Sequence, residues 1–99
     1  MIKNCYNEIL LLKKRMDDAN IPYYFEEYMN GYRLAYPNNN DVKCSVIEHD
    51  GSYGRHEDLL EIMGLLTEEE EKYDCVLGSL TSSNVFSRIQ KDYLAQLKP

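Results

Sequence analysis

Apolar residues recur along the first part of the chain with the period of an α-helix. They are three or four positions apart, at Ile2, Cys5, Ile9, Leu12, Met16 and Ala19. This spacing places them on one face of a helix. Asn20 can adopt the left-handed conformation that ends a helix, and Pro22 prevents its continuation. We therefore expect an N-terminal helix of roughly 16 residues.

The next segment reads as two strands joined by a tight turn. Asn30-Gly31 lies between the aromatic-rich runs 23–29 and 32–36. Both residues tolerate the positive φ angles that the favoured two-residue hairpin turns require. A turn centred on this dipeptide also fixes the pairing of the strands. The expected pairs are Met29 with Tyr32, Glu27 with Leu34, and Phe25 with Tyr36. The face towards the helices would then carry Tyr23, Phe25, Met29, Tyr32, Leu34 and Tyr36.

A third strand and then helices are expected in the rest of the chain. Alternating apolar positions predict a strand over residues 42–48. Residues 59–63 are interpreted as a short helix closed by Gly64, and Thr67-Glu68-Glu69-Glu70 has the form of a capping box before a second helical turn. Residues 76–80 are expected to form a buried connector. Thr81 or Ser82 would cap a last helix, whose inner face is Val85, Phe86, Ile89, Tyr93, Leu94 and Leu97.

This order of elements predicts an α+β fold. It combines an N-terminal helix, a three-stranded antiparallel sheet with an Asn-Gly hairpin, and two or three helices packed on one face of the sheet. A chain of 99 residues is long enough for one domain with one core, so residues 1–99 are expected to form a single α+β domain.

Cysteine usage and hydropathy indicate a cytoplasmic protein. Cys5, Cys44 and Cys75 are odd in number and far apart, which argues against a disulfide framework and against a zinc site. No signal peptide is apparent at Met1, and no apolar run approaches the roughly 20 residues that cross a bilayer. We expect no metal, no cofactor and no membrane association.

Acidic residues gather in the second half of the chain. The net charge is −6, and residues 57–74 contain eight acidic residues against Lys72 alone. The eight are Glu57, Asp58, Glu61, Glu68, Glu69, Glu70, Glu71 and Asp74. This charge repels phosphate backbones, so no direct binding of DNA or RNA is expected. Two interpretations stay open: a solvated helix start, or a surface that mimics nucleic acid and binds a basic protein.

The loop 49–56 is a second candidate site. It contains His49, Gly51, Ser52, Tyr53, Gly54, Arg55 and His56. Two glycines allow backbone amides to converge, and the basic side chains could add positive charge around a small anion or a nucleotide phosphate. The segment fits neither the Walker pattern nor the dinucleotide fingerprint. A purely structural loop is the alternative, since connections of this kind often need glycine for geometry alone.

The same loop offers no recognisable catalytic centre. The G-x-S-x-G elbow around Ser52 is absent, and proximity to His49 or His56 does not supply both a base and its orienting group. A metal site from His49, Asp50, His56 and Glu57 would have loose spacing and no dictated third ligand. We therefore predict that the protein has no catalytic residues and is not an enzyme.

Nearly the whole chain resembles a family of small proteins encoded by phages, prophages and conjugative elements of low-GC Gram-positive bacteria. The most specific part of the resemblance is the H-x-G-S-Y-G-x4-LLEIMGLL segment. The other matching residues are Asn20-Ile21-Pro22-Tyr23, Gly31, Tyr36-Pro37, Val46-Ile47-Glu48, Leu80-Thr81 and Val85-Phe86. The resemblance carries over no catalytic residue. It implies a mobile-element context, in which small acidic proteins often antagonise host defence, including CRISPR nucleases.

The leading hypothesis is accordingly a non-enzymatic, anti-CRISPR-like binding protein in the cytoplasm of the bacterial host. Its expected partner is a basic nucleic-acid-binding nuclease of the host, blocked by charge mimicry through the eight acidic residues. The protein itself is expected to be a monomer or a homodimer. Two alternatives remain: a small-ligand protein that binds a nucleotide or anion through the 49–56 loop, and a homo-oligomeric regulatory module.

Overall fold

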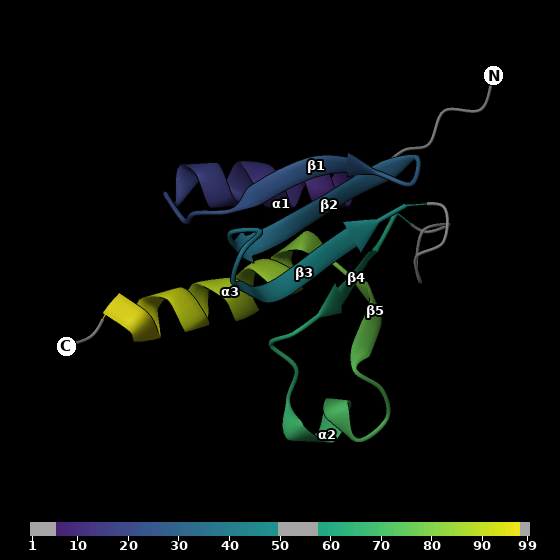
Figure 1. Ribbon diagram of the computed structural model, residues 1–99, viewed down its shortest axis with the longest axis vertical. Helices are drawn as coiled ribbons and strands as arrows, with labels where there is room; N and C mark the ends of the chain where they lie inside the picture. The colour runs from purple at the N-terminus through teal and green to yellow at the C-terminus, as the bar shows by residue number, and fades with distance from the viewer. Residues whose placement is uncertain (1–5, 50–57, 98–99) are drawn as a thin grey trace.

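A computed structural model describes residues 6–49 and 58–97 of the chain. Its elements are α1 (Asn7–Asp18), β1 (Tyr24–Tyr28), β2 (Gly31–Pro37), β3 (Val42–Glu48), β4 (Leu60–Met63), α2 (Glu68–Glu71), β5 (Val76–Leu80) and α3 (Ser82–Leu97). The strands form one antiparallel sheet in the order β1-β2-β3-β4-β5 (Figure 1). The predicted α+β class with an N-terminal helix, an antiparallel sheet and a C-terminal helix is confirmed.

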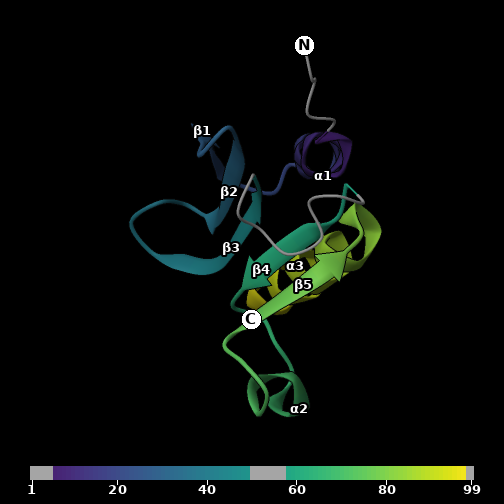
Figure 2. The ribbon, with the colours of Figure 1, turned by 90° about the vertical axis from the view of Figure 1, so that its right-hand side faces the viewer.

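Two layers make up the fold. α1 and α3 contact each other and lie on the same side of the sheet, behind it in the view of Figure 1. α1 contacts β2 and β3, and α3 contacts β4. Figure 2 shows the same arrangement from the side. Among the described residues, no helix is both long and apolar enough to cross a membrane.

The apolar stripe of the first helix faces the core as predicted. Ile9, Leu12 and Met16 are fully buried. The described helix has 12 residues, shorter than expected. It ends where the sequence indicates, because Asn20 has a φ angle of 57°. The first two positions of the stripe, at residues 2 and 5, lie outside the described residues.

The hairpin forms, but its predicted turn is wrong. The two turn residues are Met29 and Asn30, with φ angles of 48° and 64°, and Tyr28 pairs with Gly31. Glu27 is therefore opposite Tyr32 and not Leu34, so the register of the hairpin differs from the predicted one by two positions. Because a shift of two keeps each side chain on its face, the expected inner face is retained. Only Met29 leaves that face, since it lies in the turn with 60% of its surface exposed.

Gly31 is needed within β2 for a reason other than the turn. A Cβ atom at this position would lie 2.0 Å from the carbonyl oxygen of Glu48 and 2.6 Å from the Cα atom of His49. Only glycine allows β2 to approach the end of β3 this closely. The close contact with β3 thus explains why a glycine lies within β2 and not in the turn.

Two further strands replace the short helix and the connector expected after residue 58. The third strand, over residues 42–48, is confirmed. Residues 60–63, predicted as a helix, form β4, in which Leu60 and Ile62 are fully buried and Met63 is 54% exposed. That alternation is the period of a strand. Residues 76–80 form β5, which pairs with β4 and is only partly buried. The sheet therefore has five strands and not three.

The C-terminal helix begins at the predicted cap. The Thr81 hydroxyl accepts a hydrogen bond from the Asn84 amide at 3.2 Å. Val85 and Ile89 are fully buried. The predicted inner face is wrong at its far end, where Leu94 is 52% and Leu97 63% exposed. There α3 runs past the edge of β3 in Figure 1, so the sheet no longer covers it.

Carboxyl groups connect the starts of the two long helices. The Glu8 side chain accepts a hydrogen bond from the Ser82 amide at 2.7 Å, at the start of α3. Asp58 accepts one from the Glu8 amide at 3.1 Å, and Glu48 accepts one from the Ile9 amide at 3.2 Å. Because the first amides of a helix have no partner within it, these side chains satisfy groups that would otherwise be left unpaired.

Glu48 holds a proton that the unfolded chain would lose. Burial, and after it the neighbouring Asp58 carboxyl, raises the pKa of Glu48 from 4.5 to about 9. The side chain is fully buried, and a neutral carboxyl is far cheaper to bury than an ion. The folded state therefore binds this proton across the neutral pH range.

Replacing Gly31 should reveal the close approach of β2 to β3. We expect Gly31→Ala to lower the free energy of unfolding by about 2 to 4 kcal/mol, because the new Cβ atom overlaps backbone atoms of β3. Met29→Gly is the matched control, since glycine suits the positive φ angle at that position and should leave stability unchanged or slightly higher. Chemical denaturation measures both. Equal stability of the two variants would contradict the steric role of Gly31.

Stability should fall with rising pH because of Glu48. The stability from its bound proton is complete below about pH 4.5 and is lost as the pH rises through about 9, with a slope of at most about 1.4 kcal/mol per pH unit. Denaturation curves from about pH 5 to about pH 9 should show this decline in the native protein and a flatter profile in Glu48→Gln. Asp41→Asn, in an exposed turn, should keep the native profile. An identical slope in Glu48→Gln would rule out a protonated Glu48.

Candidate functional site: an acidic lobe between β4 and β5

Residues 64–75 connect β4 to β5 and project away from the sheet. We call this segment the acidic lobe; it contains α2 and lies at the lower end of the molecule in Figure 1. Figure 2 shows it below the sheet in that view as well. Five of its residues are acidic and one, Lys72, is basic.

The chain turns out of the sheet at Gly64. Its φ angle is 100°, and a Cβ atom here would lie 2.0 Å from the carbonyl oxygen of Lys43. Leu65 follows with a φ angle of 55°. Two consecutive residues with positive φ thus direct the chain away from β3, and glycine is required at the first of them.

The predicted capping box is present at the start of α2. The Thr67 hydroxyl accepts a hydrogen bond from the Glu70 amide at 3.2 Å, and the Glu70 carboxylate accepts one from the Thr67 amide at 2.8 Å. These reciprocal bonds fix the first turn of a helix only four residues long. A helix this short depends on such bonds, because its own amide ladder is minimal.

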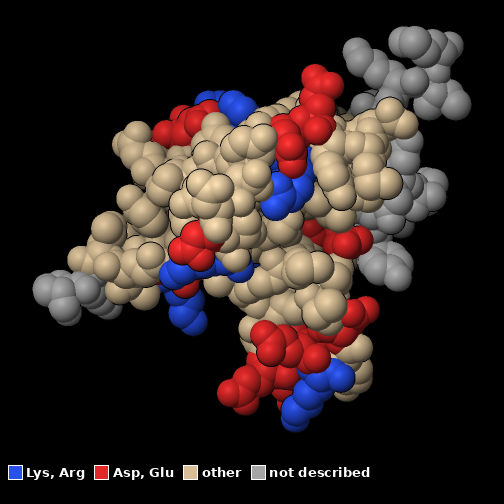
Figure 3. All heavy atoms as spheres, in the orientation of Figure 1, with Lys and Arg blue, Asp and Glu red and all other residues tan. Residues whose placement is uncertain are grey.

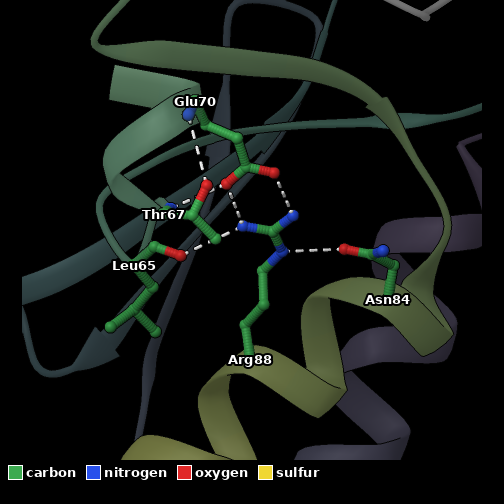
Figure 4. Close-up of polar contacts among 5 residues, drawn as sticks. All are labelled: Leu65, Thr67, Glu70, Asn84 and Arg88. Carbon is green, nitrogen blue, oxygen red and sulfur yellow. Dashed lines mark hydrogen bonds and ion pairs between the residues drawn. The ribbon is translucent and has the colours of Figure 1, made fainter. Parts of the chain in front are cut away.

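Arg88 of α3 fastens the lobe to the body of the protein (Figure 4). Its two terminal nitrogens donate hydrogen bonds to the two carboxylate oxygens of Glu70, both at 2.8 Å. The same guanidinium donates to the Leu65 carbonyl oxygen at 3.1 Å, and its Nε donates to Asn84 at 2.8 Å. A bidentate, planar contact of this kind sets orientation as well as distance. Arg88 thereby orients the acidic lobe.

Glu70 belongs to the internal framework. The hydrogen bond from Arg88 lowers the pKa of its carboxyl to about 2, so it stays ionised at any physiological pH. Its negative charge is matched by the guanidinium charge, and both side chains are largely covered, with 25% and 19% exposed. We therefore do not count Glu70 among the charges available to a partner.

Four carboxylates of the lobe face solvent. Glu68, Glu69, Glu71 and Asp74 are exposed, and within the described part of the chain none of them forms an ion pair with Lys or Arg. Figure 3 shows red carboxylates gathered over the lobe, with the blue atoms of its one basic residue at the lower edge. The lobe is thus a local concentration of negative charge on a projecting support.

An aromatic side chain lies within this charged segment. Tyr73 is 91% exposed, more than any other large hydrophobic residue in the described ranges. Exposed tyrosines that lose their water on binding are frequent energetic centres of protein interfaces. The acidic residues could be predicted as a site from the sequence, whereas Tyr73 was not predicted, although an aromatic residue within a run of charges is a visible signal.

The remaining predicted acidic residues lie elsewhere. Asp58 caps α1, and Glu61 lies on β4 opposite Ile47, on the sheet face away from the helices. Glu57 lies outside the described residues. The structure therefore brings together Glu68–Glu71 and Asp74 and separates Asp58 and Glu61 from them.

Of the second candidate site, only one residue is described. His49 is buried, with 6% of its surface exposed, and its ring meets the Tyr28 ring edge-on at a centroid distance of 5.3 Å. Gly51, Ser52, Tyr53, Gly54, Arg55 and His56 lie outside the described residues. Among residues 6–49 and 58–97, no three His, Cys, Asp or Glu side chains are placed to hold a metal ion.

A shallow groove of about 610 Å³ separates the lobe from α3. Leu65 and Leu66 line it from the lobe, and Arg88, Lys91 and Ala95 line it from α3. The guanidinium in this groove is already bound to Glu70. The groove is therefore part of the lobe's attachment to the helix.

Comparison of the chain with protein-family models, with curated proteins and with solved structures found no match.

Removing the guanidinium should loosen the lobe without unfolding the sheet. In Arg88→Ala, we expect amide hydrogens of the lobe, such as those of Tyr73 and Asp74, which bond the Glu70 carbonyl, to exchange faster. The free energy of unfolding should fall by about 1 to 3 kcal/mol, as for a lost charged hydrogen bond. Arg88→Lys should repair this only in part, because a lysine cannot form the bidentate contact.

Lys91→Ala serves as the matched control for that experiment. Lys91 is exposed on the same helix and forms no ion pair with a described residue. Its loss should leave exchange in the lobe unchanged. Faster exchange across β2 and β3 as well, or no change in the lobe, would show that Arg88 does not orient the lobe specifically.

Proposed function

We propose that the protein acts without catalysis, by binding a basic partner protein through the acidic lobe. The observation that carries the proposal is the group of four exposed, unmatched carboxylates around an exposed tyrosine. Carboxylates of this kind accelerate association with a positively charged surface. Tyr73 supplies apolar area that can be buried once the surfaces meet.

The attachment of the lobe supports the same proposal. A flexible acidic segment would lose conformational entropy on binding, whereas Arg88 and the capping box order this one beforehand. The capping box and the bidentate contact both use Glu70, which leaves the four outer carboxylates free for a partner. A preorganised surface reduces the entropic cost of association.

The class of partner follows from the charge and from the resemblance. A surface of clustered carboxylates resembles a phosphate array in its charge and repels nucleic acid itself. We propose that the partner is a basic, nucleic-acid-binding protein, and that the lobe occupies the surface meant for phosphates. The resemblance to mobile-element proteins suggests a nuclease of a bacterial defence system as the specific case.

Variants of the lobe should lose the partner selectively. Immobilised protein is used to capture proteins from a lysate of the bacterium that carries the gene, and mass spectrometry quantifies them. Captured basic proteins should be strongly depleted with Glu68→Gln/Glu69→Gln and, by about tenfold or more, with Tyr73→Ala, as expected when an aromatic anchor is removed. Capture should also weaken as salt rises from about 0.05 M to about 0.5 M.

A variant with the same net charge separates local from general electrostatics. Asp18→Asn/Asp41→Asn neutralises two exposed carboxylates away from the lobe and should capture as the native protein does. If the lobe pair and this control pair retain the same proteins equally, the acidic lobe is not the binding surface.

A further inference from the structure

The sheet has two edge strands, β1 and β5, and they differ in how regularly they pair with their neighbours. At one margin, β5 contains Ser79 with a φ angle of 59°, and its pairing with β4 shifts between Leu60 and Ile62. Irregularities of this kind disturb an edge and hinder the addition of another strand. At the other margin, β1 pairs with β2 without interruption over all five of its residues. β1 is therefore the edge strand without such irregularities.

The register of the hairpin determines which backbone groups face outward from β1. Tyr28 and Gly31 flank a two-residue turn, so they form a hydrogen-bonded pair, and bonded and non-bonded pairs then alternate along the strands. Tyr24, Glu26 and Tyr28 accordingly direct their amides and carbonyls towards β2. Phe25 and Glu27 direct theirs to the free edge, where no other described strand pairs with them.

Charge argues against a second copy of this chain as the occupant of that edge. The strand carries Glu26 and Glu27 and no basic residue. The symmetric antiparallel register that uses the outward groups of both Phe25 and Glu27 places Glu26 directly opposite Glu26 of the other copy. That pair would be a non-hydrogen-bonded one, in which side chains are closest, and like charges there are destabilising.

A basic segment would meet the opposite situation. The charge of Glu26 is already matched by Arg33 at 3.0 Å, so Glu27 is the carboxylate of this strand that is available to a partner. Glu27 is exposed and forms no ion pair with a described residue. It also lines a cleft of about 560 Å³ together with Tyr6 and Tyr32. A long basic side chain opposite Glu27 would reach a carboxylate and aromatic surface together.

We propose that the free edge of β1 docks an extended segment of a partner chain as a sixth, antiparallel strand. The segment would carry a basic residue opposite Glu27. Main-chain hydrogen bonds to Phe25 and Glu27 supply affinity, and the Glu27 carboxylate selects for the basic side chain. This surface is separate from the acidic lobe, and the proposal does not depend on it.

Amide hydrogen exchange at two positions tests the proposal directly. The probe is a short synthetic peptide of alternating Val and Thr with one Lys residue at its centre, added to the full-length protein. Without peptide, the amides of Phe25 and Glu27 should exchange quickly and those of Glu26 and Tyr28 slowly. With saturating peptide, exchange at Phe25 and Glu27 should slow by about tenfold or more.

Control peptides and one variant make the outcome decisive. A peptide with Glu in place of the Lys residue should give little protection, and Glu27→Arg should weaken binding of the Lys peptide at least about tenfold through charge repulsion. No added protection at Phe25 and Glu27, or changes confined to the acidic lobe, would overturn the proposal. Protection of these two amides that rises with protein concentration alone would assign the edge to a second copy and would also overturn it.

Discussion

A row of apolar side chains crosses the sheet and joins its strands to the two long helices. Phe25 is opposite Leu34, Leu34 opposite Val46, Val46 opposite Ile62, and Ile62 opposite Leu77. The three central members, Leu34, Val46 and Ile62, are fully buried against the helices. Because a slip of one residue would turn every member of a strand to the opposite face, this row excludes every odd shift of register in the sheet. The hairpin turn, the close approach at Gly31 and the exit at Gly64 all have to fit it.

That constraint explains which parts of the fold can be predicted from the sequence. The long helices have apolar stripes that extend over several turns, and their signals are local. The signal of the third strand is also local, because apolar and polar residues alternate clearly along it. β4 is only four residues long, and Leu59-Leu60-Glu61-Ile62-Met63 suits a helical turn as well as a strand. Its pairing with β3 decides between them, and pairing between distant segments has no local signature.

The hairpin shows how a correct local rule can select the wrong residue. Asn30-Gly31 suits a two-residue turn, but Gly31 is required where β2 passes β3, and the turn moves back to Met29 and Asn30. A methionine at positive φ is unfavourable, so contacts across the sheet must outweigh that local cost. The candidate site likewise combines features with a local signal and a contact between distant residues. The acidic run and its capping box could be predicted, whereas the contact of Glu70 with Arg88, 18 positions away, could not.

The acidic character of the chain serves two physically different purposes in the structure. Glu8, Glu48, Asp58 and Glu70 each accept a hydrogen bond from an amide at the start of a helix, where negative groups are favoured. Their contribution is internal, and in Glu48 it is made by a protonated carboxyl. Over the described ranges, the outer carboxylates of the lobe accept no hydrogen bond from an amide at the start of a helix. Asp74 accepts one from the amide of its neighbour Cys75. Net charge alone therefore overstates the field that a partner would meet over most of the surface. What a partner would meet is a local field, concentrated where the β4–β5 connection leaves the sheet and held in place by an arginine from α3.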